Sequence, residues 1–120
     1  MKNPMHTAVV HTFNAFRWSL QGLAAALRTE ISFRVDAVLF IVFFALGLWL
    51  GETLIEKLLL VGVLFIVLIA DLLNAAIETV VDMVSPDYSE NAKRAKDIAS
   101  AAVFLALLLV LVTWGLILFA

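Results

Sequence analysis

The chain has 120 residues, of which 64% are hydrophobic, and its mean hydropathy is +1.08. Soluble domains contain roughly 45–50% apolar residues, so this composition argues against an ordinary soluble protein and predicts a membrane protein. The net charge of -2 gives no reason to expect a nucleic-acid partner, and the absence of cysteine excludes disulfides and thiolate metal sites. At this length we expect a single domain over residues 1–120.

The first 30 residues predict an amphipathic helix. Within residues 5–28 the apolar positions recur at spacings of three and four: Phe13, Phe16, Leu20, Leu23 and Leu27. A helix of this kind beside membrane spans is expected to lie in the membrane interface, with its apolar face in the acyl boundary. The region lacks the compact apolar stretch and small-residue cleavage site of a signal peptide, so we expect it to be retained.

Three long apolar segments follow, at residues 33–50, 54–84 and 98–119. Each reaches the roughly 20 residues that a helix needs to cross the ~30 Å hydrocarbon core. Backbone polar groups in lipid must be paired internally, so these segments are expected to be helices. The predicted fold is an all-α integral membrane protein with one surface helix and three transmembrane helices, the second of which extends into the cytoplasm.

Lysine and arginine residues predict the orientation. Four lie at or before the start of the first span, three lie in the 85–97 loop, and only Lys57 lies between the first two spans. Cytoplasmic segments carry an excess of these residues. We therefore expect the N-terminal helix and the 85–97 loop in the cytoplasm, and the C-terminus outside.

The stretch DLLNAAIETVVD, residues 71–82, adds polar side chains to an otherwise apolar span. At 100° per residue they fall within an arc of about 80° on an α-helix. These residues are Asp71, Asn74, Glu78 and Asp82. An ionisable residue at membrane depth costs at least ~2.5–3.5 kcal/mol on insertion scales, so Asp71 needs a partner or a wet cavity. The carboxylates either pair structurally with lysine and arginine or assemble a site.

The four polar residues of 71–82 form one stripe along the predicted helix, and their residue types favour magnesium as a bound metal. Carboxylate and amide oxygens are hard ligands, and Mg²⁺ usually binds one or two carboxylates together with substrate phosphates. His6 and His11 have no metal-binding spacing, which argues against zinc. The chain contains no glycine-rich P-loop, so a nucleotide would have to be held by metal and by basic side chains.

A second polar cluster, ENAKRAKDIASAA, opens the third span. Lys93, Lys96 and Ser100 lie at spacings of three and four and share one helix face. Alone this face would indicate interfacial anchoring or attraction to anionic lipid. Beside an acidic stripe it is a candidate phosphate clamp, and Glu30 in RTEISFR supplies another carboxylate at the same depth.

The motifs DLLNAAIETVVD and AKDIASAA, with TEISFR upstream and three spans behind an amphipathic helix, resemble the small prokaryotic diacylglycerol kinases and their undecaprenol kinase relatives. The resemblance covers roughly residues 9–118. It implies a homotrimer in the bacterial inner membrane, with active sites shared between subunits at the cytoplasmic surface. It also implies Mg-ATP as phosphoryl donor and a lipid alcohol as acceptor. The S-A-A-V run favours diacylglycerol, with undecaprenol as the alternative.

The resemblance further implies roles at the nucleotide end. Glu30 and Glu78 are similar to carboxylates that hold the metal and, with it, the nucleotide. Lys96 and Asp97 match a Lys-Asp pair that contacts the phosphates and the nucleoside. His11 falls where many family members have a basic residue near the phosphates.

At the acceptor end, Asp71 resembles the proposed general base for the lipid hydroxyl and is expected, with Ser100, to contact the lipid. Family members usually carry glutamate there. Aspartate is one methylene shorter, and a misplacement of ~1 Å can cost ~10²-fold in rate. Asn74 matches an asparagine that orients groups around the hydroxyl, whereas Asp82 and Arg34 are expected to have structural or orienting roles.

Two classes of function therefore remain open from the residues. Phosphoryl transfer needs positioning, charge neutralisation and a base near the attacking hydroxyl, all of which these side chains offer. The rival is a non-enzymatic oligomeric membrane protein that uses the same acids as a cation path. The Lys-Asp pair across the loop favours the kinase, because a simple ion path does not require it.

Overall fold

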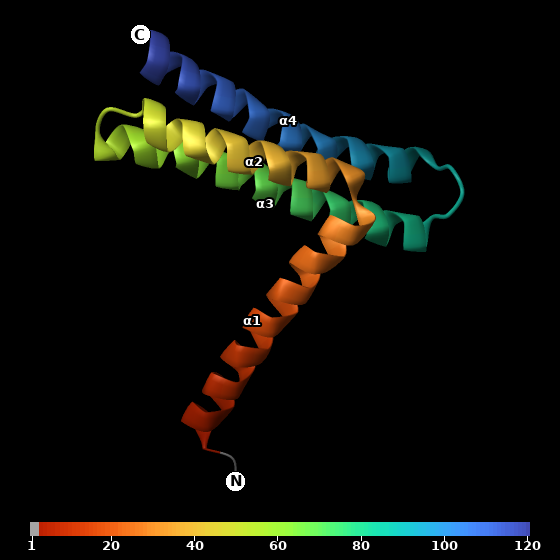
Figure 1. Cartoon of the computed structure of the whole chain (residues 1–120). Coiled ribbons are helices and arrows are strands. Elements are labelled where there is room, and N and C mark those ends of the chain that lie inside the picture. Colours follow the sequence, from red (N-terminus) through yellow and green to blue (C-terminus); the bar gives the residue numbers. More distant parts are fainter. Residues whose placement is uncertain (1–2) are drawn as a thin grey trace.

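The computed structural model describes residues 3–120, which form four α-helices. They are α1 (Pro4–Thr29), α2 (Ile31–Leu50), α3 (Leu54–Val84) and α4 (Glu90–Phe119). Figure 1 shows α2, α3 and α4 side by side as a bundle, whereas α1 leaves the bundle at a steep angle. The predicted all-helical fold is confirmed, and α4 begins at Glu90, so it includes the polar cluster that opens the third span.

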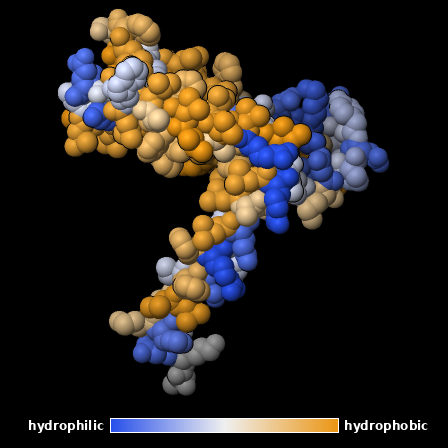
Figure 2. Space-filling view, in the orientation of Figure 1, coloured by the Kyte–Doolittle hydropathy of each residue, from blue (hydrophilic) through white to orange (hydrophobic). Residues whose placement is uncertain are grey.

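The three bundle helices are long and apolar enough to cross a membrane. Figure 2 shows a mostly hydrophobic bundle surface, with hydrophilic residues gathered at its ends and along α1. Large apolar side chains such as Trp49 and Leu54 are exposed on the bundle helices. A surface of this kind is stable in lipid, so the protein is a multi-pass membrane protein.

Local capping fixes where the helices begin and end. Glu30 has an extended backbone, closes α1 through its N–H to the Ala26 carbonyl, and is also the residue from which α2 starts. At the start of α3, the Thr53 hydroxyl accepts from the Glu56 N–H at 3.1 Å, and a Glu56 carboxylate oxygen accepts from the Thr53 N–H at 3.0 Å. This reciprocal capping box satisfies two backbone donors that the first helical turn leaves unpaired.

Helix α3 is the centre of the bundle, with α2 and α4 packed against it. Gly47 lets α2 approach closely, because a Cβ at this position would lie 3.3 Å from atoms of both Leu60 and Val61. From α4, the Trp114 indole N–H donates to the Leu60 carbonyl at 3.1 Å, and its ring packs edge-on against Phe43 of α2. Trp114 therefore joins three helices, a role that the sequence alone did not predict.

Candidate active site

The polar stripe of α3 faces different environments along its length. Asp71, Asn74 and Glu78 are half-buried, whereas the side chain of Asp82 is 63% exposed. The Asn74 amide donates to a Glu78 carboxylate oxygen at 3.5 Å. One oxygen of Asp71 (Oδ2) and the amide oxygen of Asn74 are buried without a hydrogen-bond donor. Orphaned buried acceptors are rare and costly, so this part of the stripe is built to receive further groups.

Asp71 does have one polar neighbour, which the sequence analysis did not single out. Asp36, half-buried on α2, lies close to the Asp71 carboxyl group. Helices α2 and α3 run antiparallel and are joined by the short turn at 51–53. Counted along the chain, residue 36 is about as far from that turn as residue 71. The hairpin topology was therefore the signal that would have predicted that Asp36 and Asp71 lie close together.

Glu30 lies at the junction between α1 and α2, half-buried beside α3. It lines a groove of about 570 Å³ between α1 and α3, together with Ala75, Ala76 and Thr79 of α3. The small side chains on both sides keep this groove open. The structure therefore brings Glu30 to the level of α3 that also bears Glu78.

The carboxylates of Glu30 and Glu78 fit a magnesium ion that is bound together with phosphate oxygens. They do not fit a metal ion that is held by protein side chains alone. Within residues 3–120, no three histidine, cysteine, aspartate or glutamate side chains gather closely enough to hold a metal ion. Glu30 and Glu78 are half-buried, and neither forms an ion pair with a described cation. Mg²⁺ typically takes one or two carboxylates and completes its shell with water and substrate phosphates.

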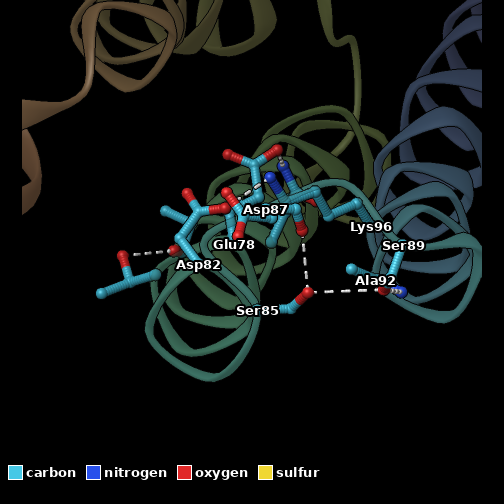
Figure 3. Close-up of polar contacts among 10 residues, drawn as sticks. Glu78, Asp82, Ser85, Asp87, Ser89, Ala92 and Lys96 are labelled. Atoms are coloured by element: carbon cyan, nitrogen blue, oxygen red, sulfur yellow. Dashed lines mark hydrogen bonds and ion pairs between the residues drawn. The ribbon is translucent and has the colours of Figure 1, made fainter.

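Lys96 of α4 reaches across to α3. Its ammonium group lies 2.6 Å from an Asp82 carboxylate oxygen, as Figure 3 shows. Lys96 precedes the apolar segment 98–119, and its pKa is raised by this hydrogen bond, with the charges of Asp82 and Glu78 adding to the effect. The lysine therefore remains a cation close to the glutamate end of the stripe.

The other members of the second cluster pair with each other. Lys93 and Asp97, one helical turn apart and both exposed, form an ion pair of 2.6 Å. Lys93 was expected to share the clamp face with Lys96. It also neutralises Asp97, so each of the two candidate nucleotide-binding residues of α4, Lys96 and Asp97, is engaged by a side chain of opposite charge.

The loop 85–89 holds the ends of α3 and α4 together. The Ser85 hydroxyl donates to the Asp87 carbonyl at 2.9 Å and lies 3.4 Å from the Ser89 hydroxyl. Ser89 caps α4 by accepting from the Ala92 N–H at 3.0 Å. Figure 3 shows these contacts next to the ion pair of Asp82 and Lys96. The loop thereby keeps the acidic and basic clusters adjacent.

No hydrogen bond or ion pair within the described chain joins the side chains of His11, Arg34 or Ser100 to the stripe. His11 is exposed on α1, where its ring meets Trp18 edge-on, with the ring centroids 6.4 Å apart. At 1.5 Å per residue it stands about 27 Å from the end of α1. Arg34 and Ser100 are also exposed. The roles of all the site residues stay predictions.

The three long apolar helices define a small multi-pass membrane protein. Its polar site contains acids, an amide and a lysine where α3 meets α4, and these groups are suited to phosphoryl transfer. The family model described as prokaryotic diacylglycerol kinase matches residues 17–118. The chain belongs to this family.

Curated relatives match almost the whole chain. It is 42% identical to the diacylglycerol kinase of Haemophilus influenzae over 113 residues, covering 94% of this chain and 96% of the relative. Identity is 40% over 112 residues with that of Pseudomonas aeruginosa, covering 93% and 91%. It is 35% over 114 residues with that of Escherichia coli K12, covering 95% and 93%.

These likenesses confirm the predicted family and, with it, the prediction of a lipid kinase enzyme, which implies the use of ATP. They favour the kinase over the rival class, a non-enzymatic protein with a cation path.

Proposed function

We propose that this chain transfers the γ-phosphoryl group of Mg-ATP to diacylglycerol and forms phosphatidic acid. The observation that carries the proposal is the continuous polar stripe on α3. It runs from Asp71, which has a buried oxygen without a hydrogen-bond donor, to Asp82, which forms an ion pair with Lys96 of α4. The curated relatives bear the name diacylglycerol kinase, which supports this acceptor over undecaprenol. The catalytic residues alone do not separate the two alcohols.

At the nucleotide end, Glu30 and Glu78 would hold Mg²⁺, which would neutralise charge on the phosphate oxygens when bound. Lys96 would exchange Asp82 for a phosphate oxygen, since both are anionic acceptors for the same ammonium group. Asp97 would face the nucleoside, and His11 would add a donor near the phosphates.

At the acceptor end, Asp71 would accept the proton of the lipid hydroxyl, and Asn74 would orient the groups around it. Asp71 and Glu78 are seven residues apart, which is about 10 Å along the axis of α3. That separation leaves room for a hydroxyl and a terminal phosphate between the base and the metal ligand. Ser100 would contact the lipid, whereas Asp82 and Arg34 would orient the site.

The same reasoning supports a homotrimer with shared sites. His11 stands about 27 Å along α1 from the junction at Glu30, so its predicted phosphate contact requires a neighbouring subunit. The excess of lysine and arginine in the N-terminal helix and the 85–97 loop supports a cytoplasmic location for both, with the C-terminus outside the inner membrane. The nucleotide end of the stripe would then face the cytoplasmic ATP.

Parallel assays on two lipid alcohols test the proposal. Purified protein in mixed micelles is given γ-labelled Mg-ATP with dioleoylglycerol or with undecaprenol, and its oligomeric state is measured in the same detergent. We expect label in phosphatidic acid, a clear preference for dioleoylglycerol, and loss of turnover when magnesium is chelated. An intact oligomer that transfers no label to either alcohol would exclude the kinase activity. A preference for undecaprenol would show that undecaprenol, rather than diacylglycerol, is the acceptor.

A further inference from the structure

Helix α1 carries two arginines that none of the proposed roles uses. Arg17 and Arg28 are exposed, and neither forms an ion pair within the described chain. Residues 4–29 contain no aspartate or glutamate, so α1 has no acid of its own to neutralise them. Exposed cations without a counter-charge attract anions from outside the chain.

Together with His6, these arginines form one line along α1. Successive members are eleven residues apart, which is about three helical turns and rotates each one by only about 20° from the last. At 1.5 Å per residue they stand about 16 Å apart along the helix axis. His6, Arg17 and Arg28 are the basic edge of α1. A single phosphate group cannot contact two members that are so far apart, so the edge suits a surface that offers many phosphates.

The basic edge borders the apolar face of the same helix. Phe13, Phe16 and Leu20 lie on that face, and each is more than half exposed. The middle of the face is about 80° around the helix from the basic edge. When such a face lies in the acyl boundary, side chains at this angle stand at the level of the lipid headgroups. A long arginine there can extend its guanidinium group to the headgroups while its stem stays on apolar surface.

The opposite flank of α1 is taken by the bundle. Ala26 is buried, and Ser19, Gly22 and Ala26 line the groove that separates α1 from α3. Ala26 is about 160° around the helix from Arg28, so the basic edge points away from the bundle. Figure 1 shows that α1 leaves the spanning helices at a steep angle, and Figure 2 shows hydrophilic residues beside hydrophobic ones along it. A helix in the membrane surface would lie in this way, with its free flank open to lipid.

We propose that the basic edge binds the phosphate groups of anionic phospholipids and thereby holds α1 on a negatively charged membrane surface. Guanidinium groups bind phosphate strongly, often through two parallel hydrogen bonds. A lipid surface suits the edge better than a free anion, because it offers a phosphate to each member at once and places acyl chains beside the adjoining apolar face. The inference goes beyond the proposed phosphoryl transfer and does not depend on it.

Lipid-specific quenching beside the basic edge tests this binding in the whole protein. Ala24→Cys places the only thiol of the chain on the same edge, exposed between Arg17 and Arg28, and carries a fluorophore. The protein is reconstituted in phosphatidylcholine vesicles with increasing amounts of nitroxide-labelled phosphatidylglycerol or nitroxide-labelled phosphatidylcholine. Half-maximal quenching should need about fivefold less of the anionic lipid, which is the effect of one basic residue at a charged membrane surface. A fluorophore at Leu116→Cys, exposed near the C-terminal end of α4, should be quenched equally by both lipids.

Charge variants of the labelled protein separate electrostatic binding from mere proximity. The double variant Arg17→Gln, Arg28→Gln should bring the two quenching curves together, whereas Arg17→Lys, Arg28→Lys should keep them apart. Arg94→Gln removes an exposed arginine from α4 and is the matched control, which should leave the preference unchanged. Salt at about 1 M shortens the screening length to about 3 Å, so it should weaken the preference of the wild-type edge.

Two results would overturn the inference: equal quenching by the two lipids with both arginines present, or a preference for phosphatidylglycerol that survives the loss of both. Self-quenching between labels on neighbouring chains, without quenching by lipid, would also overturn it and would show that a second copy covers the basic edge. If the double glutamine variant does not fold, the single variants and the salt series decide, since each should lower the preference on its own.

Discussion

Lys96 of α4 and Asp82 of α3 form an ion pair of 2.6 Å at the end of the bundle where loop 85–89 connects the two helices. The Asp82 side chain is 63% exposed and that of Lys96 is 39% exposed. Ion pairs as open to water as this one add little to stability. Its importance is therefore positional, because it keeps the ammonium group of Lys96 near Glu78.

Asp82→Asn tests that positional role. The variant removes the charge that holds Lys96, so the KM for Mg-ATP should rise several-fold, while the melting temperature in detergent should stay close to that of wild type. Steady-state kinetics and a thermal scan measure both quantities. Asp87→Asn, in the neighbouring loop, is the matched control. A large fall in melting temperature with unchanged kinetics would show that Asp82 is purely structural.

Glu78→Gln tests the metal ligand. Glutamine preserves the size of the side chain and can still accept from Asn74, but it lacks the charge that Mg²⁺ requires. We expect kcat to fall by about 10² or more, which is typical for the loss of one electrostatic contact to a reacting group. The oligomer should remain intact. Glu90→Gln, in the exposed first turn of α4, should keep wild-type turnover.

Magnesium titration of the same variants completes the test. If Glu78 belongs to the metal shell, any residual activity of Glu78→Gln should saturate at a higher Mg²⁺ concentration than in wild type. Full activity with an unchanged magnesium dependence would remove Glu78 from that role.

The close approach of α2 to α3 makes a separate prediction about stability. In Gly47→Ala the added methyl group would lie 3.3 Å from side-chain atoms of Leu60 and Val61, so these neighbours must give way by a few tenths of an ångström. Overpacking of this kind costs about 1–3 kcal/mol. Gly115→Ala is the control, because its Cβ would meet nothing within 4 Å. Unfolding in detergent should therefore separate the two variants, and equal stability would contradict the tight contact.

Orientation can be measured directly because the chain has no cysteine. Glu52→Cys and Asn91→Cys place single thiols on exposed residues, one near each end of the bundle. In right-side-out vesicles a membrane-impermeant maleimide should label residue 52 at once and residue 91 only after permeabilisation. The opposite pattern would put the nucleotide end of the stripe on the wrong side for cytoplasmic ATP.

Local sequence patterns were sufficient for the helices and for the stripe. Hydropathy and length predicted the spans, and α3 runs from Leu54 to Val84 as the segment 54–84 suggested. The 100° rule placed Asn74 and Glu78 on one face, where the structure has them in contact. The charged cluster that opens the third span forms the first turns of α4, which Ser89 caps.

Relationships between helices were harder to predict from a single sequence. The sequence analysis did not single out Asp36, and its closeness to Asp71 depends on the register of α2 against α3. The bond from Trp114 to the Leu60 carbonyl depends likewise on how α4 is rotated. Periodicity within one helix gives neither the register between two helices nor the rotation of one helix against another.

Glu30 belongs to two helices at once, as the residue that closes α1 and the residue from which α2 begins. With the amphipathic α1 on the lipid surface, as its sequence predicts, a change in its tilt would bend the backbone at this joint. A thinner or thicker bilayer would therefore displace Glu30, a proposed metal ligand, without moving α3. The thickness of the membrane would then affect how the nucleotide is held.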